Sequence, residues 1–401
     1  MNVLFLSISS IPNANAHSIS LDLLREFSKN GHNVYIVASI ERREGAETIF
    51  SEEGGFKILR VKIGNNKKAN LIEKGITTVM LPSLYKSAIK KYLSDVKFDL
   101  VLYATPPITH CETVNYIKKR DGATSYLMLK DIFPQNAVDI GMMSKSGVKG
   151  ILYRYFRSKE KKLYALSDRI GCMSQANVDY LLKHDPEISP EKIEICPNSI
   201  EINDMRISQA EREEIRRKYD IPLDKKVFVY GGNLGKPQGI PFIIECLKKQ
   251  NNTDAYFLIV GDGTEYGKLE TFINEAKPQN VRLMNKLPKE DYDRMVAACD
   301  VGMIFLDHRF TIPNFPSRLL SYMQAGIPVF ACTDPNTDVG KVIVEGGFGW
   351  WCESNDADAF CATVDEALSA DREQMQEKEI KYLSENFSVE RAYRTILSQG
   401  E

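Results

Sequence analysis

The sequence predicts an α/β protein built from two doubly wound domains. Apolar strand-like runs alternate with helix-like segments along the whole chain, a pattern typical of parallel sheets covered by helices. The alternation breaks once, near Pro197, and then resumes. A chain of 401 residues is also too long to fold around a single ordinary hydrophobic core. We therefore expect a first domain over 1–200, a second over 201–380, and a C-terminal helix over 381–401 that packs back toward the first domain.

Composition indicates a globular protein of ordinary charge. The formal net charge is −2, which gives no reason to expect a nucleic-acid partner. The eight cysteines are dispersed, without a C-x-x-C pair, and most lie in apolar runs, which favours a reducing compartment. The opening residues MNVLFLSISS carry no basic region and are interpreted as a strand rather than a signal peptide. No apolar run is long enough to span a bilayer, so we expect a cytoplasmic protein.

The first domain opens with a strand and an amphipathic helix. The strand is expected at Val3–Ser7, and the helix Ser20–Asn30 carries Leu21, Leu24 and Phe27 on one face. Further elements of this half are expected as strands at Val34–Ala38, Ile58–Ile63, Leu100–Tyr103, Ser125–Leu129, Arg169–Met173 and Ile193–Cys196, and as helices at Leu84–Asp95, His110–Arg120, Val148–Leu166 and Gln175–His184.

The second domain follows a charged helix at Gln209–Tyr219. Ligands of open parallel sheets bind beyond the carboxyl ends of the strands. The loop Ser9–His17 in the first domain and the turn at Gly231 in the second are therefore expected to face each other. The charged tail Asp371–Gln399 has a helical pattern. Strands of the second half are expected at Val227–Tyr230, Ala255–Val260, Val281–Met284, Val301–Leu306 and Val329–Cys332.

A glycine-rich segment, VFVYGGNLGKPQGI, begins at Val227. It predicts a strand to Tyr230, a glycine turn starting at Gly231, and a helix from Ile240. Such a turn presents backbone N–H groups and the positive end of a helix to an anion, and Lys236 adds a full positive charge. The segment matches neither the P-loop nor the G-x-G-x-x-G pattern. A phosphate site and a plain tight turn both remain open on the residues alone.

A second segment, Thr311–Gly326, is also a candidate for anion binding at the start of a helix. Its sequence TIPNFPSRLLSYMQAG predicts a helix with Ser317 as N-cap and Gly326 as its end. Arg318 lies in the first turn, where a cation opposes the helix dipole. A bound anion would explain this arginine, and so would a solvated side chain.

These segments make the chain similar to the retaining GT-B glycosyltransferases of family 4, also called group 1. Within that family it resembles enzymes that add N-acetylated deoxyaminosugars or similar residues during bacterial O-antigen and capsule assembly. The resemblance spans the chain in order, through GHNVYIVAS, LKDIFPQNAVDIGMM, CPNSI, YGGNLGKPQGI, VGDGTEYGKL, LPKEDYDRMVAACDVGMIFL and PSRLLSYMQAGIPVFA.

The resemblance implies a GT-B fold, in which two Rossmann-like domains face each other across a cleft. It implies a metal-independent transferase of hexosyltransferase type, with a nucleotide-diphosphate sugar, expected to be UDP-linked, as donor. The implied acceptor is a lipid-linked saccharide of surface polysaccharide synthesis, at the inner face of the cell membrane. Neither a nucleic-acid partner nor a metal cofactor is expected, since the residues show no metal-ligand pattern. Asp334 and Asp338 are interpreted as part of a solvated turn.

The resemblance also implies which residues form the site. Lys236 and Arg318 would stabilise the departing diphosphate, whose own phosphate takes the acceptor's proton. Asp131 and His110 are further catalytic candidates at strand ends of the first domain, although helix capping would explain either. The implied donor-binding residues are Gly231, Gly232, Asn233, Gly261, Asp262, Lys286, Leu287, Asn314, Ser317, Leu319 and Ser321, and the acceptor-side loop offers Asn13, Asn15 and His17.

The chain departs from the family pattern at three positions. Two glutamates with seven residues between them are replaced by Pro313 and Ser321, and the usual arginine of the glycine turn falls on or near Asn233. Part of the donor recognition is therefore open. An epimerase of the UDP-GlcNAc type and a non-catalytic nucleotide-sugar-binding protein remain as alternatives.

The segment Lys145–Tyr164, KSGVKGILYRYFRSKEKKLY, is basic and rich in aromatic residues. This pattern is typical of a peripheral contact with an anionic membrane surface. It is also compatible with an ordinary helix that has one buried and one solvated face. Both interpretations are kept.

Overall fold

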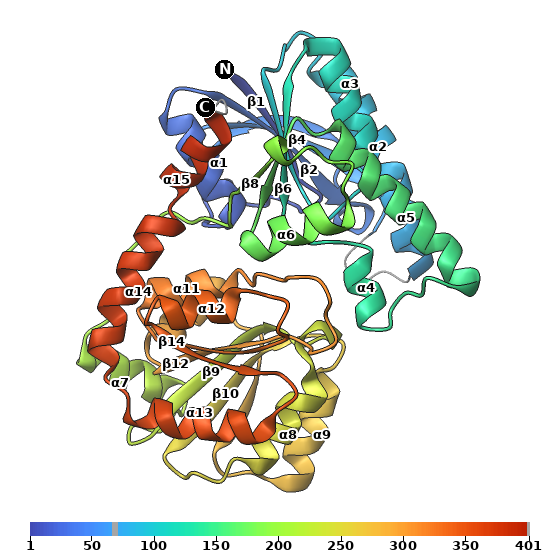
Figure 1. Cartoon of the computed structure of the whole chain (residues 1–401). Coiled ribbons are helices and arrows are strands. Elements are labelled where there is room, and N and C mark those ends of the chain that lie inside the picture. The colour runs from blue at the N-terminus through green and yellow to red at the C-terminus, as the bar shows by residue number, and fades with distance from the viewer. Residues whose placement is uncertain (66–70, 399–401) are drawn as a thin grey trace. The chain divides into compact units, whose positions relative to one another are not determined.

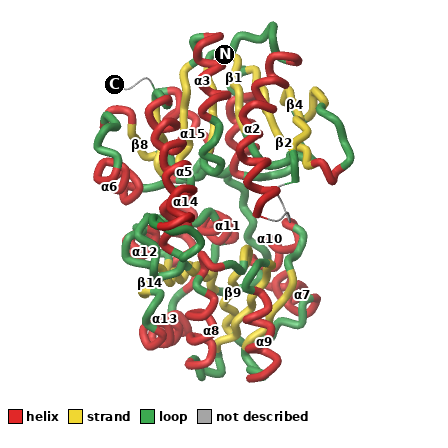
Figure 2. The backbone as a smooth tube through the Cα atoms, turned by 90° about the vertical axis from the view of Figure 1, so that its right-hand side faces the viewer, coloured by secondary structure: helices red, strands yellow, loops and turns green. Residues whose placement is uncertain are grey.

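The computed structural model describes residues 1–65 and 71–398, which divide into two compact units. Unit 1 comprises Met1–Glu201 together with Val389–Glu401, and unit 2 comprises Ile202–Ser388. Each unit is a sheet of mainly parallel strands with helices on both faces (Figure 1 and Figure 2). Among the helices that the structure describes, none is long and apolar enough to cross a membrane.

The sheet of unit 1 has eight strands in the described part of the chain, in the order β3-β4-β2-β1-β5-β6-β7-β8. Its central strand β1 pairs in parallel with β2 and β5, and Val3 and Leu4 in β1 are fully buried. The strands are β1 (Asn2–Leu6), β2 (Asn33–Glu41), β3 (Ile49–Glu53), β4 (Phe56–Ile63), β5 (Leu100–Ala104), β6 (Thr124–Leu129), β7 (Arg169–Cys172) and β8 (Ile193–Ile195); the helices are α1 (Ile19–Lys29), η1 (Arg42–Glu44), α2 (Leu71–Tyr92), α3 (Cys111–Asp121), α4 (Gln135–Asp139), α5 (Gly147–Leu166), α6 (Gln175–His184), η2 (Pro190–Lys192) and α15 (Val389–Leu397).

One strand of this sheet departs from the expected parallel arrangement. β3 runs antiparallel to β4, and the turn between them contains Gly54 and Gly55, with φ of +58° and +79°. Two residues with positive φ form the tight turn that joins antiparallel neighbours. β3 was not predicted, because its five residues, IFSEE, contain only a short apolar start.

The sheet of unit 2 has the strand order β11-β10-β9-β12-β13-β14, and its neighbouring strands pair in parallel. This matches the doubly wound pattern that the sequence predicted. The strands are β9 (Lys226–Asn233), β10 (Ala255–Asp262), β11 (Val281–Asn285), β12 (Val301–Phe305), β13 (Val329–Thr333) and β14 (Gly349–Glu353); the helices are α7 (Gln209–Lys218), η3 (Lys236–Gln238), α8 (Ile240–Lys249), α9 (Tyr266–Ala276), α10 (Lys289–Ala297), α11 (Arg318–Ala325), α12 (Val339–Glu345), α13 (Ala357–Ser369) and α14 (Arg372–Asn386).

One hydrophobic core of unit 2 lies between the sheet and helices α8, α9 and α13. Phe228 and Phe257, on neighbouring strands, stack with ring centroids 5.3 Å apart, and Phe360 of α13 packs on Phe257, Phe305 and Phe330. Aromatic side chains bury large apolar areas, so this cluster fixes the sheet that carries the candidate site.

The C-terminal region forms two helices that belong to different units. The sequence predicted a single element over 381–401, but α14 extends to Asn386 within unit 2, where it packs on α11. From Val389 onward the chain belongs to unit 1, where α15 lies beside α1 (Figure 1). The tail reads as continuously helical because the break at Phe387 and Ser388 contains neither glycine nor proline.

Residues of α15 complete the core of unit 1. The ring of Tyr393 lies edge-on to Phe27 at 4.9 Å between centroids, and its hydroxyl lies 2.9 Å from Nε2 of His32. The guanidinium of Arg169 donates to the carbonyl oxygens of Thr395 and Ile396 at the end of the helix. Unit 1 is thus built from two separate stretches of sequence.

Candidate active site

The predicted donor-binding residues line the carboxyl edge of the unit 2 sheet. Adjacent strands β11, β10 and β9 end at Asn285, Asp262 and Asn233, and the connection from β12 leads to α11. Parallel neighbours place their carboxyl ends along one edge, which is where open α/β sheets bind ligands. The structure therefore brings the predicted segments to a common edge, because each segment follows one of these parallel neighbouring strands.

The glycines after Tyr230 belong to a strand rather than to the expected turn. β9 continues to Asn233, and Gly231, Gly232 and Asn233 pair in register with Val260, Gly261 and Asp262 of β10. The turn comes later, between Leu234 and Gly239, and contains the short helix η3. The apolar run alone suggested an end at Tyr230, because glycines have a low strand propensity.

Close packing explains why glycine is required in this strand. A Cβ on Gly231 would lie 1.8 Å from the hydroxyl oxygen of Tyr292, on α10. A Cβ on Gly261 would lie 2.0 Å from the carbonyl oxygen of Gly232, whose own φ is +123°. The glycines therefore let α10 and the neighbouring strand approach this edge closely.

Arg318, at the start of α11, is held against the glycines. Its guanidinium donates to the carbonyl oxygen of Gly231 at 2.9 Å and lies 4.4 Å from the centroid of the Tyr230 ring. Burial lowers the pKa of Arg318, whereas the neighbouring tyrosines Tyr230, Tyr322 and Tyr292 raise it. The tyrosines together have the larger effect, so the pKa lies above its ordinary value. A cation over an aromatic face with a carbonyl partner is fixed in position. Arg318 is partly exposed and so remains accessible to an anion.

The start of α11 differs from the sequence expectation in its capping. Ser317 has helical backbone angles, and its side chain makes no capping hydrogen bond. Ser317 is exposed, and the carbonyl oxygen of the preceding Pro316 accepts from Leu319 N–H. Leu319 is fully buried, so the side chain of this predicted donor-binding residue faces the core. Ser321 is half-buried.

A partly buried turn, which was expected to be solvated, supports the segment before α11. Asp334 is fully buried, and its Oδ1 accepts from the backbone N–H groups of Asn336 and Thr337. Asn336 Nδ2 donates to the carbonyl oxygen of Phe310 at 2.6 Å, and Thr337 Oγ1 donates to that of Asn314 at 2.5 Å. Burial raises the pKa of Asp334 to about 6. Within the turn Asp334 and Thr337 are buried, whereas Pro335 and Asn336 are exposed.

The remaining predicted donor-side residues are solvent-facing. Lys236 and Lys286 are exposed, and Leu287 is half-buried. The turn that carries Lys236 is fixed by Gln238, whose side-chain oxygen accepts from Asn233 Nδ2 and from Gly235 N–H. A mobile cation on a fixed turn can adjust to an anion at this edge.

The predicted acceptor-side loop lies at the carboxyl end of β1 in unit 1. Arg60 donates to the carbonyl oxygen of Ile11 through Nε and Nη2, at 3.1 and 3.0 Å, and Arg25 donates to that of Ala14. The predicted side chains Asn13, Asn15 and His17 are exposed on this loop. The loop is therefore held by its backbone and presents its polar side chains to solvent.

Asp131 follows β6 at the same edge of unit 1. The side-chain amide of Asn136 donates to both carboxylate oxygens, at 2.7 and 2.9 Å, and the backbone N–H of Asp131 donates to Thr105 Oγ1. Burial raises the pKa of this carboxyl group to about 6, although its hydrogen bonds lower it. The residue as a whole is half-buried.

His110 was predicted at the cleft and is instead fully buried. Its ring stacks on Tyr85 with centroids 5.8 Å apart, and neither ring nitrogen has a hydrogen-bond partner in this structure. Burial lowers its pKa to about 4, so the ring is neutral near pH 7. The side chain is thus buried at the start of α3, and a role for His110 at a substrate stays a prediction.

Comparison with known proteins identifies the kind of enzyme. Residues 211–383 match the family described as glycosyl transferases group 1. A probable glycosyltransferase of Pseudomonas aeruginosa, WbjE, is 26% identical over 356 residues, covering 85% of both chains. The protein is a glycosyltransferase with a group 1 region in unit 2.

Solved structures agree with the fold of this glycosyltransferase. WaaG, a glycosyltransferase involved in lipopolysaccharide biosynthesis, superposes with a TM-score of 0.67 at 15% identity and covers 99% of this chain and 100% of its own. Anabaena Alr3699/HepE in complex with UDP-glucose gives a TM-score of 0.69 at 13% identity, over 99% and 98% of the two chains. The predicted GT-B fold class is confirmed.

The glycosyltransferase also brings together three potential metal ligands that the sequence pattern did not reveal. Atoms of His17, Asp22 and Glu201 lie within 4.8 Å of one another in unit 1. Arg25 pairs with Asp22, and Lys29 Nζ lies 2.6 Å from Glu201. Each carboxylate thus already has a cationic partner. Sequence spacing misses this cluster because Glu201 is remote in the chain.

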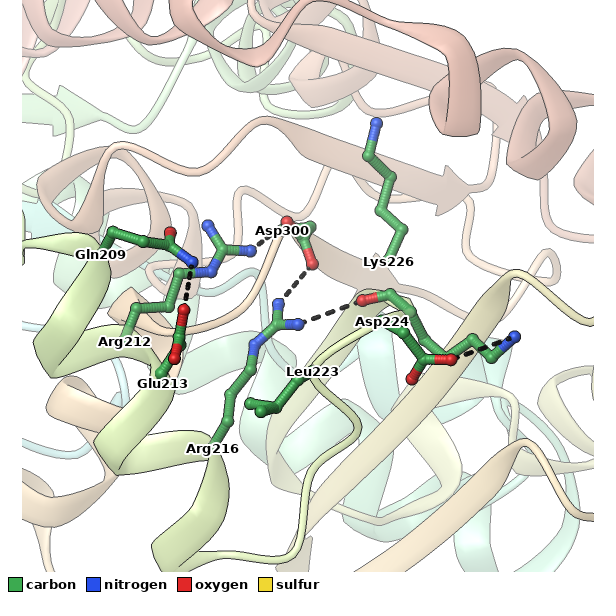
Figure 3. Close-up of a pocket in the computed structure, with 9 residues that line it drawn as sticks. Gln209, Arg212, Glu213, Arg216, Leu223, Asp224, Lys226 and Asp300 are labelled. Carbon is green, nitrogen blue, oxygen red and sulfur yellow. Dashed lines mark hydrogen bonds and ion pairs between the residues drawn. The ribbon is translucent and has the colours of Figure 1, made fainter.

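A polar pocket of about 320 Å³ lies where β9 and β12 begin (Figure 3). It is therefore at the amino ends of these strands, whereas the donor-side residues lie at the carboxyl ends. Asp300 accepts from Arg212, Arg216 and the backbone N–H of Val227. Arg216 also donates to the carbonyl oxygens of Ala298, Pro222 and Lys225. These contacts fix α7 to the sheet, so we assign the cluster a structural role.

The residues that sequence reasoning missed act by contact across the fold. Tyr292 and Tyr322 surround Arg318 from α10 and α11, and Asn336 and Thr337 hold the loop before α11. The pattern DPNTD gave one usable signal, because an aspartate two residues before an asparagine favours a turn stabilised by its own side chain.

Proposed function

We propose that this glycosyltransferase transfers a sugar from a UDP-sugar to a lipid-linked saccharide in bacterial surface polysaccharide synthesis, with retention of anomeric configuration. The observation that carries the proposal is Arg318, fixed by Gly231 and Tyr230 at the start of α11. An immobile guanidinium beside a helix N-terminus and a glycine-lined strand edge suits a diphosphate. The complexes of HepE with UDP and UDP-glucose and the role of WaaG in lipopolysaccharide biosynthesis support this direction.

In the proposed reaction, the bond between the anomeric carbon and the diphosphate oxygen breaks while the acceptor oxygen attacks the same face. The acceptor proton passes to the departing phosphate, so no protein base is required. Negative charge develops on the diphosphate, where Arg318, the positive end of the α11 dipole and Lys236 would stabilise it. We propose that these cations suffice without a metal ion. Asp131 would orient a hydroxyl group of the acceptor or of the transferred sugar.

The donor sugar is proposed to be N-acetylated, as in the enzymes that the sequence resembles. The two glutamates absent at Pro313 and Ser321 would otherwise contact the donor. In their place this edge offers Asn233 and the exposed Ser317. The acceptor would meet the loop that carries Asn13, Asn15 and His17, at the inner face of the cell membrane.

Purified full-length protein tests the donor assignment. UDP should raise the melting temperature more than ADP or GDP does, because a ligand that binds only the folded state stabilises it by mass action. UDP release from UDP-N-acetylated sugars should persist in EDTA. Preference for ADP or GDP would overturn the base assignment, and loss of turnover in EDTA would overturn metal independence. An epimerised donor would favour an epimerase, and binding without UDP release would favour a non-catalytic protein.

A further inference from the structure

The first half of α5 exposes an apolar stripe to solvent. Val148, Ile151, Leu152 and Tyr155 are 86%, 63%, 49% and 37% exposed. Their spacing of three, four and seven residues places them on one face of the helix. In a globular core helix that face would be buried, whereas α5 buries only Gly150, Glu160, Leu163 and Tyr164. The interpretation as an ordinary helix with one buried apolar face therefore does not describe its first half.

Positive side chains border this stripe on both sides. Successive helical residues are roughly 100° apart, so Lys149, next after Val148, and Arg154, just before Tyr155, lie on opposite flanks. Lys145 precedes the helix, and all three cations are exposed. In the part of the chain that the structure describes, no acidic partner is recorded for these three, whereas Arg157 binds Glu160 and Asp185.

The second half of α5 anchors the helix to unit 1. Leu163 and Tyr164 are 0% and 2% exposed, and Tyr164 donates to Glu160 within the buried region. Figure 1 shows the first half of α5 projecting beyond α3, next to α4. The exposed stripe therefore lies on a rigid, attached helix and does not need to detach in order to meet a partner.

We propose that Val148, Ile151, Leu152 and Tyr155, with Lys145, Lys149 and Arg154, form a membrane-binding surface for anionic lipid. Here this set is called the α5 surface. Apolar residues between basic flanks match the interface of a bilayer, where the stripe enters the acyl boundary and the cations meet headgroup charges. A second copy of the chain fits less well, because a twofold contact through this surface would bring like charges together.

This inference rests on the proposed function only in that a lipid-linked acceptor gives membrane binding a purpose. The surface itself belongs to unit 1, whereas the donor-side residues belong to unit 2. Vesicle binding and UDP binding can therefore be measured separately, and either can fail without the other.

The test is sedimentation of the full-length protein with vesicles of phosphatidylcholine, alone or with about one-third phosphatidylglycerol, compositions chosen to vary the surface charge. Binding should require phosphatidylglycerol and weaken at high salt. The variant Lys145→Gln, Lys149→Gln, Arg154→Gln should bind roughly 100-fold more weakly, because each cation near an anionic surface contributes a factor of roughly five. The variant Val148→Ser, Ile151→Ser, Leu152→Ser should also lose binding.

A charge-matched control removes three exposed lysines of unit 2, through Lys218→Gln, Lys341→Gln and Lys381→Gln. It should retain vesicle binding. All variants should keep the UDP-induced melting shift of the wild type. Wild-type protein that shows this shift but does not bind anionic vesicles would overturn the inference alone. Vesicle binding without any UDP shift would overturn the proposed function alone. Self-association that the α5 variants abolish, with no vesicle binding, would assign the surface to a second copy.

Discussion

The guanidinium of Arg318 donates a hydrogen bond to the carbonyl oxygen of Gly231, 2.9 Å away. The two residues lie on different elements, and the bond joins the start of α11 to the end of β9. An arginine held in this way needs little reorganisation when a diphosphate arrives, which is how fixed charges accelerate the departure of an anion.

Replacing Arg318 should remove most of the turnover. We expect Arg318→Ala to lower kcat roughly 100-fold to 1000-fold, the range for removing one fixed donor to a developing anion. Arg318→Lys should recover only part of this, since a lysine cannot bond Gly231 and lie flat on Tyr230 at once. Steady-state UDP release measures the effect. The exposed arginine Arg294, also in unit 2, provides a control through Arg294→Ala, and equal kinetics of the three variants would contradict the assignment.

A methyl group on Gly231 should disturb the site through Tyr292. Gly231→Ala would place Cβ 1.8 Å from the Tyr292 hydroxyl, and overpacking of this kind costs about 1–3 kcal/mol. We expect a lower melting temperature and weaker binding of the donor. The double variant Gly231→Ala, Tyr292→Leu should be more stable than Gly231→Ala alone, as measured by urea denaturation. An unchanged melting temperature in the single variant would show that the two elements separate freely.

The partly buried turn at Asp334 should affect donor binding more than the chemical step. Asn336→Ala removes the hydrogen bond to the carbonyl oxygen of Phe310, and a typical loss of about 1 kcal/mol corresponds to roughly a fivefold rise in KM for the donor. The value of kcat should change less. Asn355→Ala, at an exposed asparagine that bonds Glu353, is the matched control. A fall in kcat at constant KM would assign Asn336 a different role.

Asp300 should matter for stability rather than for catalysis. Asp300→Ala leaves Arg212 and Arg216 without their shared carboxylate, and breaking a buried pair in this way costs about 3–5 kcal/mol. Urea denaturation measures this loss, whereas UDP release per folded molecule should stay near wild type. Asp224→Ala, at an exposed carboxylate of the same pocket, should change stability little. A selective loss of activity in Asp300→Ala would instead point to a ligand in this pocket.

His110 should make stability depend on pH in the acid range. Its pKa is about 4 in the folded protein and 6.5 without burial, so between these values the unfolded chain binds a proton that the folded protein does not. The free energy of unfolding should therefore fall as the pH drops from 6.5 to 4, by on the order of 3 kcal/mol in total. His110→Phe, which keeps a flat ring beside Tyr85, should reduce this slope in urea titrations at several pH values. Parallel slopes for both proteins would show that another group titrates.

The predictable part of this molecule is the part encoded by local pattern. The period of apolar residues located β9, α8 and α11, and α6 was predicted with its observed bounds. The end of β9 was misplaced because Gly231 and Gly232 are poor strand formers that are kept for what packs against them. Pattern at one position carries no information about Tyr292 on another helix, so the steric reason for Gly231 appeared only in the structure.

In the candidate site, too, only the residues that a local pattern marks could be predicted. Arg318 was identifiable because a cation in a first helical turn opposes the dipole and asks for an explanation. The inward turn of His110 was not, since a histidine at a strand end can face either way. Burial of Asp334 was also hidden, because turn-forming residues have the same signature whether the turn is wet or packed beneath a loop.

The return of α15 to unit 1 has a consequence for biosynthesis. Phe27 and His32 emerge early from the ribosome, whereas Tyr393, which closes over them, is translated only after all of unit 2. The surface around Phe27 and His32 therefore stays uncovered while unit 2 is being translated. A nascent chain stalled before Val389 would expose this surface to chaperones and proteases.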